Sequence, residues 1–445
     1  MTALRARIGA LTGGEGLAQR AFRGSALTVI GFGTMQAIRL GSNLILTRLL
    51  FPEVFGLMTL IMVIIQGLNN FSDVGIAPAI MQSRRGDEPR FLDTAFTLQV
   101  MRGVALWLGC CVLAWPAARF YDIPELVWFL PVAGLTAVIH GLQTTRVETA
   151  NRHLRIARLT LVEIIGAAAS VAVTIVLAAA MRSAWALVIG LVLGAVIKVT
   201  LAARMLPGHA NRLHWDRTAV AELVAFGKWI FPSTVVGFAI SQGDKAILGK
   251  YLTLRELGIY NIAFFFASFP LMLGQAVTGK IMIPVYRHAA DTPAPERRAQ
   301  LRRVRLGLTG GFLALLLVLA AFGPQLVGLL YDARYAQAGP MVTMIACATI
   351  PALLTLTYDH AALAAGDSRG FFWVTLARAV LFLALFLAGV RAGGIAGALA
   401  GQALAGVLCW PLIVRLARRH GVWDPAHDVL AAAGGIAVAA LLLLR

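Results

Sequence analysis

The chain reads GSALTVIGFGTMQAIRLGSNLILTRLLFPEVFGLMTLIMVIIQGLNNFSDVGIAPAIM from Gly24 to Met81, and this stretch decides the fold. It consists of an apolar arm, a tight break at Arg48-Leu-Leu-Phe-Pro-Glu53, and a second apolar arm. Each arm has the length of about 20 apolar residues that an α-helix needs to cross the hydrocarbon core of a bilayer. The stretch therefore predicts a hairpin of two membrane-spanning helices.

Both arms carry polar residues along one side only. In the first arm these residues recur at helical spacing, at Gln36, Arg39, Asn43 and Thr47. In the second arm they fall at i, i+3, i+4 and i+7, at Gln66, Asn69, Asn70 and Asp73. Polar groups are costly in contact with lipid and normally face protein or a water-filled cavity. Two adjacent polar stripes therefore indicate a lined interior.

The hairpin recurs later in the chain. A shift that places Arg48 on Lys250 aligns RLLFPEVFGL with KYLTLRELGI without a gap. The same shift pairs Gly41 with Gly243, Ile45 with Ile247, Leu46 with Leu248, and Gly56 with Gly258. Identities that gather at a hairpin turn indicate an internal duplication, which is frequent in transporters.

The amino-acid composition is that of a membrane protein. Of 445 residues, 59% are hydrophobic and 13% are charged, and the mean hydropathy is +0.78. This balance predicts an all-α polytopic membrane protein. The formal net charge of +18 comes mostly from short loops between apolar segments, so we expect no nucleic-acid partner.

We expect about 12–13 spans in two parallel six-helix lobes around a central cavity. The first six spans lie near residues 24–47, 55–80, 94–117, 126–147, 159–181 and 183–205. The second six lie near 228–250, 256–282, 306–331, 338–363, 371–390 and 394–416. The predicted domains are an N-terminal lobe (1–206), a C-terminal lobe (207–420) and an additional membrane segment (421–445), in which 429–444 is short for a span.

Arginine-rich loops follow the even-numbered spans, whereas loops after odd-numbered spans hold mostly single cations. This pattern predicts a cytoplasmic N-terminus, because cytoplasmic loops carry the excess of Lys and Arg. The longest polar connection, Val285–Arg305, is expected to begin as a loop and to continue as a basic helix on the cytoplasmic membrane surface. The basic start of the chain lacks the features of a removable signal peptide.

Charged residues inside the spans favour cations. The cations are Arg39, Arg102, Lys245, Lys280 and Arg378, and the acids are Asp73, Glu163, Asp244 and Asp359. The repeat brings Arg39, Asn43, Asp244 and Lys245 toward one central cavity. Such a cavity suits a phosphate or diphosphate, because Arg offers two parallel donors and Lys a point charge. In the alternative interpretation, Asp244 and Lys245 pair with each other or reach the membrane surface.

The predicted substrate site in the central cavity comprises those five cations and the amides Gln36, Asn43, Asn69 and Asn70. The four intramembrane acids are the candidates for ion coupling. No nucleotide-binding, metalloenzyme or serine-hydrolase motif is present in the sequence, so we expect no catalytic residues and no metal or organic cofactor. The four cysteines lie in apolar segments without metal-ligand spacing, and His140 and His360 are expected to be packed and hydrogen-bonded.

Several motifs resemble a known family. They are RLLFPEVFGL at residues 48–57, DVGIA at 73–77, FGKW at 226–229, DKAILG at 244–249, LGIY at 257–260 and IPVY at 283–286. Together they are similar to the Wzx-type oligosaccharide flippases of the multidrug/oligosaccharidyl-lipid/polysaccharide (MOP) superfamily, over most of residues 20–416. Members of that family usually have twelve or fourteen spans.

The resemblance implies a flippase that moves an undecaprenyl-diphosphate-linked oligosaccharide from the cytoplasmic to the periplasmic leaflet by alternating access. This activity serves lipopolysaccharide O-antigen, exopolysaccharide or capsule assembly in the bacterial inner membrane. The resemblance also implies coupling to an H⁺ or Na⁺ gradient and a polysaccharide polymerase as a partner.

Three alternatives stay open. A multidrug exporter of the same superfamily would need an acidic cavity for cationic drugs, and the cation excess argues against it. A lipid II flippase would share the basic cavity. A membrane enzyme of polysaccharide assembly would need a large outer loop with catalytic groups, and the sequence has none.

Overall fold

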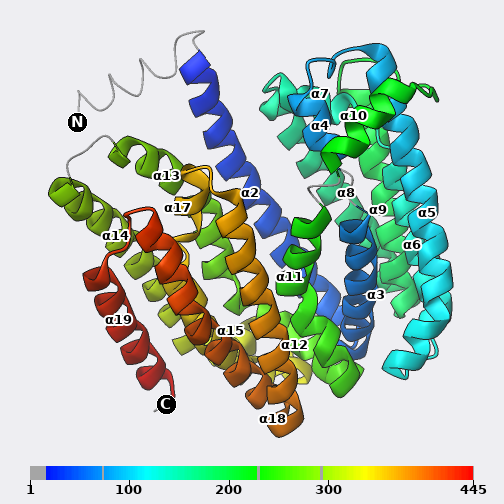
Figure 1. Cartoon of the computed structure of the whole chain (residues 1–445). Coiled ribbons are helices and arrows are strands. Elements are labelled where there is room, and N and C mark those ends of the chain that lie inside the picture. The colour runs from blue at the N-terminus through cyan, green and yellow to red at the C-terminus, as the bar shows by residue number, and fades with distance from the viewer. Residues whose placement is uncertain (1–16, 73–74, 228–230, 291–293, 444–445) are drawn as a thin grey trace, which may run out of the picture. The chain divides into compact units, whose positions relative to one another are not determined.

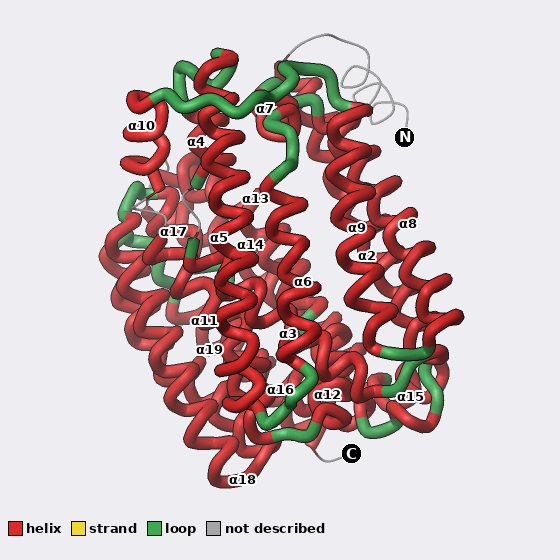
Figure 2. The backbone as a smooth tube through the Cα atoms, turned by 90° about the vertical axis from the view of Figure 1, so that its right-hand side faces the viewer, coloured by secondary structure: helices red, strands yellow, loops and turns green. Residues whose placement is uncertain are grey.

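The computed structural model describes residues 17–72, 75–227, 231–290 and 294–443. Within these ranges the regular structure is helical and no β-strand occurs (Figure 2). Seven described helices are long and apolar enough to cross a membrane, and the number reaches nine if each of two bent helix pairs is one span. The prediction of an all-α, multi-pass membrane protein is therefore confirmed. The total of about 12–13 spans stays a prediction.

The chain divides into two compact units, one of residues 1–50 and 61–235 and one of residues 51–60 and 236–445. Residues 207–235 belong to the first unit, because the helix that begins at Arg217 packs on helices of that unit. The division into lobes of residues 1–206 and 207–420, with an additional segment at 421–445, stays a prediction.

Antiparallel helix pairs build the first unit. Its elements are α2 (Leu17–Leu49), the second half of α3 (Pro52–Phe71), α4 (Ile76–Gln82), α5 (Pro89–Tyr121), α6 (Leu126–Gly141), α7 (Arg146–Arg152), α8 (Ile156–Met181), α9 (Ala184–Met205) and α10 (Arg217–Gly227). α5 packs along α6, and α8 packs along α9 (Figure 1). Glycines allow this close approach, since a Cβ on Gly103 of α5 would lie 2.5 Å from the carbonyl oxygen of Ala137 on α6.

The second unit begins with the first half of α3 and most of α11 (Phe231–Tyr251). It continues with α12 (Leu254–Ala267), α13 (Phe269–Ala290), α14 (Ala294–Ala321), α15 (Gly323–Leu330), the 3₁₀ turn η1 (Ala333–Tyr335), α16 (Ala338–Thr355), α17 (Asp359–Ala364), α18 (Ser368–Arg419) and α19 (Pro425–Leu443). An apolar core joins α14, α16 and α19 around Leu316, Leu353 and Val438.

Helix α18 is a hairpin of two helices, because the backbone leaves the helical conformation at Gly393 and Gly394. Gly394 has a φ of 59°, which glycine adopts without steric cost. After this turn the two arms press together at the backbone, so that a Cβ on Gly389 would lie 2.0 Å from the carbonyl oxygen of Gly397. The two arms correspond to the spans predicted near residues 371–390 and 394–416.

The duplicated hairpins meet in a reciprocal contact within the second unit. A Cβ on Gly56 would lie 2.0 Å from the carbonyl oxygen of Leu254, and a Cβ on Gly258 would lie 2.0 Å from the carbonyl oxygen of Pro52. Gly56 and Gly258 are equivalent in the sequence repeat, as are Pro52 and Leu254. The first turns of α3 and α12 therefore cross in a symmetric manner, which supports the predicted duplication.

The basic connection between α13 and α14 differs from its expected position on the membrane surface. Arg305 is fully buried and donates to the carbonyl oxygen of Val422, while its guanidinium lies 4.2 Å from the ring centroid of Tyr358. Arg302 donates two hydrogen bonds to Asp424, of 2.7 and 2.9 Å. The expectation was wrong for Arg305, because partners in the connection before α19 and on α13 hold its guanidinium inside the protein, whereas Arg302 stays partly exposed. The connection also does not begin as a loop, since α13 continues to Ala290.

We predict that Gly56→Ala lowers the free energy of unfolding by about 3 kcal/mol, because the new methyl group collides with backbone atoms that cannot rotate away. The matched control is Gly307→Ala in α14, where a Cβ meets nothing within 4 Å and the change should be neutral or slightly stabilising. Thermal unfolding of the detergent-solubilised variants measures both effects. Equal Tm values for the two variants would contradict the prediction.

Candidate functional site

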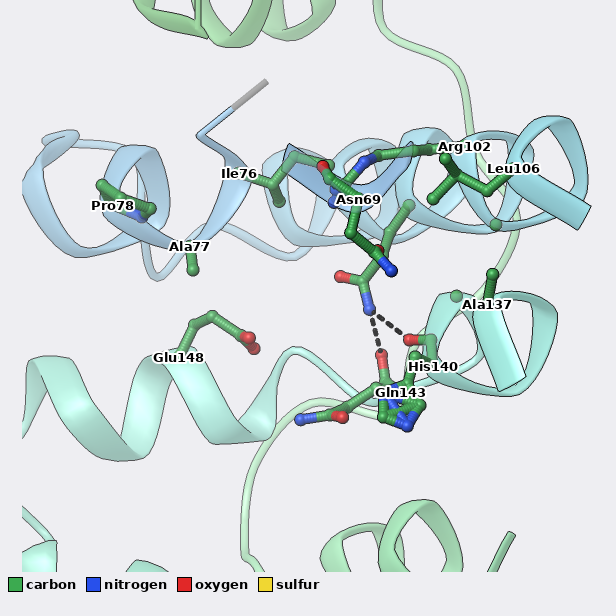
Figure 3. Close-up of a pocket in the computed structure, with 13 residues that line it drawn as sticks. Asn69, Ile76, Ala77, Pro78, Arg102, Leu106, Ala137, His140, Gln143 and Glu148 are labelled. Atoms are coloured by element: carbon green, nitrogen blue, oxygen red, sulfur yellow. Dashed lines mark hydrogen bonds between the residues drawn. The ribbon is translucent and has the colours of Figure 1, made fainter. Parts of the chain in front are cut away.

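A cavity of about 310 Å³ opens in the first unit among α3, α4, α5, α6 and α7 (Figure 3). Its polar lining comprises Asn69, Gln99, Arg102, His140, Gln143 and Glu148. The apolar lining includes residues 76–78 of α4. A concave site with a few convergent polar groups is typical of a binding site for a small ligand or an ion.

The packing of α5 on α6 positions one of these amides, that of Gln99. Gln99 donates from Nε2 to the carbonyl oxygen of His140 at 2.9 Å, which satisfies a carbonyl at the end of α6. Gly103 and Gly141 lie in close contact beside this bond, since a Cβ on Gly141 would lie 3.3 Å from the Cα of Gly103. After Gly141 the chain turns, and α7 continues at an angle of 56° to α6. This bend opens the cavity.

Arg102 holds the carboxyl end of α3. Its guanidinium donates to the carbonyl oxygen of Asn69 at 2.7 Å and to Oγ of Ser72 at 3.0 Å. A cation at the end of a helix satisfies free carbonyls and interacts favourably with the helix dipole. The structure thus places both Asn69 and Arg102 at a cavity within the first unit, whereas the prediction put them in a central cavity between two lobes. A role of either residue in substrate binding stays a prediction.

Glu148 projects from α7 into the cavity (Figure 3). Its Oε2 atom is buried and has no hydrogen-bond partner. Sequence reasoning missed this residue, because it lies just beyond a predicted span, where a glutamate is normally solvated. Neither its spacing nor its neighbours in the sequence distinguish it from a loop residue.

Arg152 anchors α7 to the end of α4. It donates to the carbonyl oxygens of Ile80, Met81 and Ser83 at 2.7–3.0 Å, and it forms an ion pair with Asp87 at 3.0 Å. Burial acts to raise the pKa of Asp87, but a hydrogen bond from His153 and the charges of His153 and Arg152 outweigh it and lower this pKa below its ordinary value. Asp87 therefore stays ionised, and the position of α7 is fixed.

A second acidic position lies in the second unit, on α11. Asp244 is 3% exposed, accepts a hydrogen bond of 2.8 Å from the hydroxyl of Tyr260 at Oδ2, and has no partner for Oδ1. Lys245 is also buried, with its ammonium 4.2 Å from the ring centroid of Phe264 and 3.5 Å from Oε1 of Gln242. Both side chains are therefore buried, with their described partners on α11 and α12.

Arg378 and Asp359 neutralise each other. The guanidinium of Arg378 on α18 donates to both carboxylate oxygens of Asp359 on α17, at 3.0 and 2.8 Å. His360, beside this pair, lies 3.1 Å from the hydroxyl of Thr278, which confirms that this histidine is packed and hydrogen-bonded. The pair gives Arg378 and Asp359 a structural role, and their predicted roles in substrate binding and ion coupling are not tested by it.

The remaining predicted residues are spread over several helices. Arg39 of α2, Lys280 of α13 and Glu163 of α8 are exposed, whereas Gln36 and Asn43 of α2 are half-buried. Asn70 accepts a hydrogen bond from Gln66 at 3.0 Å. Asp73 lies outside the described residues.

The shared central cavity predicted for Arg39 and Lys245 stays a prediction, since these residues belong to different units. Within the described part of the chain, no group of three or more His, Cys, Asp or Glu side chains is arranged to hold a metal ion.

The fold defines a class of protein, the multi-pass helical membrane proteins. The structure is similar to that of the lipid II flippase MurJ in an inward closed conformation, with a TM-score of 0.69 and 10% identity over 94% of this chain and 100% of that one. It is also similar to a multidrug resistance MATE family transporter in an inward-facing conformation, with a TM-score of 0.62 and 13% identity over 86% of this chain and 95% of that one. At such identities the likeness concerns the fold alone.

The family model for polysaccharide biosynthesis proteins matches residues 45–340, and the chain belongs to that family. The chain is 22% identical over 337 residues to the succinoglycan biosynthesis transport protein ExoT of Rhizobium meliloti, which covers 76% of this chain and 67% of ExoT. It is 24% identical over 275 residues to the lipopolysaccharide biosynthesis protein WzxC of Escherichia coli, which covers 60% of this chain and 53% of WzxC. The resemblance to the Wzx-type polysaccharide transporters is therefore confirmed.

We predict that Arg378→Gln lowers the free energy of unfolding by roughly 3 kcal/mol, because it leaves the carboxylate of Asp359 without its counter-charge inside the protein. The double change Arg378→Gln with Asp359→Asn removes both charges and should recover most of that loss. A double-mutant cycle of chemical unfolding in detergent measures the coupling. Additive effects of the two single changes would show that the pair does not stabilise the fold.

Proposed function

We propose that the protein is a flippase that translocates undecaprenyl-diphosphate-linked oligosaccharide units across the bacterial inner membrane. The observation that carries the proposal is the family match over residues 45–340, with relatives named for succinoglycan transport and lipopolysaccharide biosynthesis. The direction is from the cytoplasmic to the periplasmic leaflet, with the N-terminus in the cytoplasm. The product serves surface polysaccharide assembly, in which a polymerase is the expected partner.

The chemistry of the substrate fits the polar residues of the chain. A diphosphate carries negative charge that an exposed cation such as Arg39 neutralises, since arginine offers two parallel donors to phosphate oxygens. Sugars are held by amides such as Gln36, Asn43 and Asn70, while the polyprenyl chain stays in the bilayer. The protein forms and breaks no covalent bond in this process and acts without a cofactor. An H⁺ or Na⁺ gradient supplies the free energy.

Lipid II is the second candidate substrate, because the similarity to MurJ extends over 94% of this chain. Lipid II also consists of a polyprenyl diphosphate with a sugar headgroup, so the same cations and amides would serve. The headgroup distinguishes the two substrates, and both must therefore be tested in parallel.

The first test reconstitutes the full chain in liposomes with a fluorescent undecaprenyl-diphosphate oligosaccharide. The fraction of label that becomes accessible to an external quencher measures translocation. We expect protein-dependent movement of this lipid that exceeds the movement of labelled lipid II and of a cationic dye. Faster movement of lipid II would assign the second candidate, and dye transport without lipid movement would assign a drug exporter.

We predict that Arg39→Ala slows this translocation by about tenfold or more, because a charge-assisted contact to the diphosphate is worth roughly 1.5–3 kcal/mol. Arg39→Lys keeps the charge and should retain most of the activity. The control is Arg119→Ala, which removes an exposed cation in the last turn of α5. If Arg39→Ala translocates at the wild-type rate, Arg39 does not bind the diphosphate.

A further inference from the structure

Two carboxylate oxygens among the described residues are buried and lack a hydrogen-bond partner, Oδ1 of Asp244 and Oε2 of Glu148. The other carboxylate oxygen of Asp244 accepts a hydrogen bond from the buried hydroxyl of Tyr260. Glu148 differs, because its side chain reaches into a cavity of about 310 Å³ (Figure 3). An ionised carboxylate without partners is costly in such a place, and a bound proton or metal cation removes the cost.

The cavity around Glu148 offers neutral oxygen atoms to a cation. The amide side chains of Asn69, Gln99 and Gln143 line it together with the carboxylate. Gln99 uses its Nε2 atom as donor to the carbonyl oxygen of His140, so that its amide oxygen serves as an acceptor. Carboxylate and amide oxygens are the ligands that hard cations prefer.

The other charges near Glu148 restrict the ligand to a single positive charge. Among the described residues, Arg102 on α5 and His140 on α6 are the other ionisable residues of the lining, and Lys198 on α9 lies close to His140. Helix α4 contributes no titratable residue, and α8 and α9 meet α7 through an apolar cluster that includes Ala150. The positive charge of Arg102 beside a single carboxylate disfavours a divalent cation and also supplies the repulsion that releases a monovalent one.

The same groups connect Glu148 to the ends of two helices. Arg102 holds the end of α3 through Asn69 and Ser72, and Arg152 on α7 holds the end of α4. A charged Glu148 attracts the guanidinium of Arg102 across the cavity, whereas a neutralised Glu148 leaves that guanidinium with α3. The charge on Glu148 therefore influences the ends of α3 and α4 that Arg102 and Arg152 hold.

We propose that Glu148 is the cation-coupling residue of the first unit, whose carboxylate takes up one monovalent cation, H⁺ or Na⁺, in the cavity lined by Asn69, Gln99 and Gln143. Uptake neutralises the carboxylate, and release restores its attraction for Arg102. This proposal deepens the flippase function and rests on it for the transport consequence, whereas the cation binding itself does not depend on which lipid is carried.

The binding test uses the full-length protein in detergent and needs no substrate. The Tm is measured against NaCl at constant ionic strength with choline chloride, and against pH in sodium-free buffer, because a ligand of the folded state raises Tm. A rise with Na⁺ identifies Na⁺, and a rise on acidification without a Na⁺ effect identifies H⁺. We expect Glu148→Gln, which mimics the neutral acid, to abolish the dependence of Tm on the cation. Glu148→Asp should raise the cation concentration at the midpoint of the Tm rise at least tenfold.

Glu125→Gln is the matched control, since Glu125 is an exposed glutamate at the start of α6, the end of that helix opposite to His140, and its change should leave the cation dependence intact. If Glu148→Gln does not fold, Glu148→Asp and His140→Gln still test the site through a shift in the cation or pH midpoint. Wild-type dependence in all of these variants would overturn the proposal.

The transport test imposes a Na⁺ or pH gradient on the liposomes that contain the labelled lipid. We expect Glu148→Gln to lose at least a tenfold stimulation by the gradient while slow translocation without a gradient continues. If the wild type moves no lipid-linked oligosaccharide but its Tm responds to the cation through Glu148, the flippase function fails and the site stands. If lipid moves and Glu148→Gln keeps the full gradient response, the site fails and the flippase function stands.

Discussion

The contact on which the second unit depends is the crossing of α3 and α12 at two glycines. Each helix begins with a turn whose backbone carbonyl occupies the space that a side chain would need on the other helix, as Gly56 meets Leu254 and Gly258 meets Pro52. The start of α12 is further fixed by a capping box between Thr253 and Glu256. Because lipid supplies no hydrophobic force between helices, such backbone proximity is the main source of helix association in a membrane. The two copies of the hairpin thus have glycine at the equivalent positions where they touch.

The sequence predicted this part of the fold well because helix hairpins and repeats leave local signals. Apolar runs of the required length, a break at Pro52 and equivalent glycines are visible without any knowledge of the tertiary structure. The turn inside α18 was predicted as the break between two apolar runs near residues 371–390 and 394–416, and the structure places it at Gly393 and Gly394. Each of these features depends on residues that are close together in the chain.

The roles of charged residues were harder to predict, since a charge acts through partners that are far away in the chain. The buried Arg305 meets groups from α13, α17 and the start of α19, and Arg378 meets Asp359 on a separate helix. No spacing rule connects such residues. Glu148 shows the opposite error, because a glutamate near the end of a span looks solvated in the sequence, and only the bend between α6 and α7 encloses it. The predicted cationic cavity therefore stays a prediction, and two of its five cations, Arg102 and Arg378, make contacts that support the fold.

The hairpin of α18 has a mechanical consequence. Its two arms touch through backbone atoms at Gly389 and Gly397, and again where Gly401 meets the carbonyl of Leu385. Such a contact has no side chains that could adjust their rotamers, so that a sliding or twisting movement between the arms would bring backbone atoms into collision. The two arms of α18 therefore move as one rigid body. A conformational change of the second unit therefore moves both arms together. The backbone then bends in the connections at the two ends of α18, near Asp367 and His420.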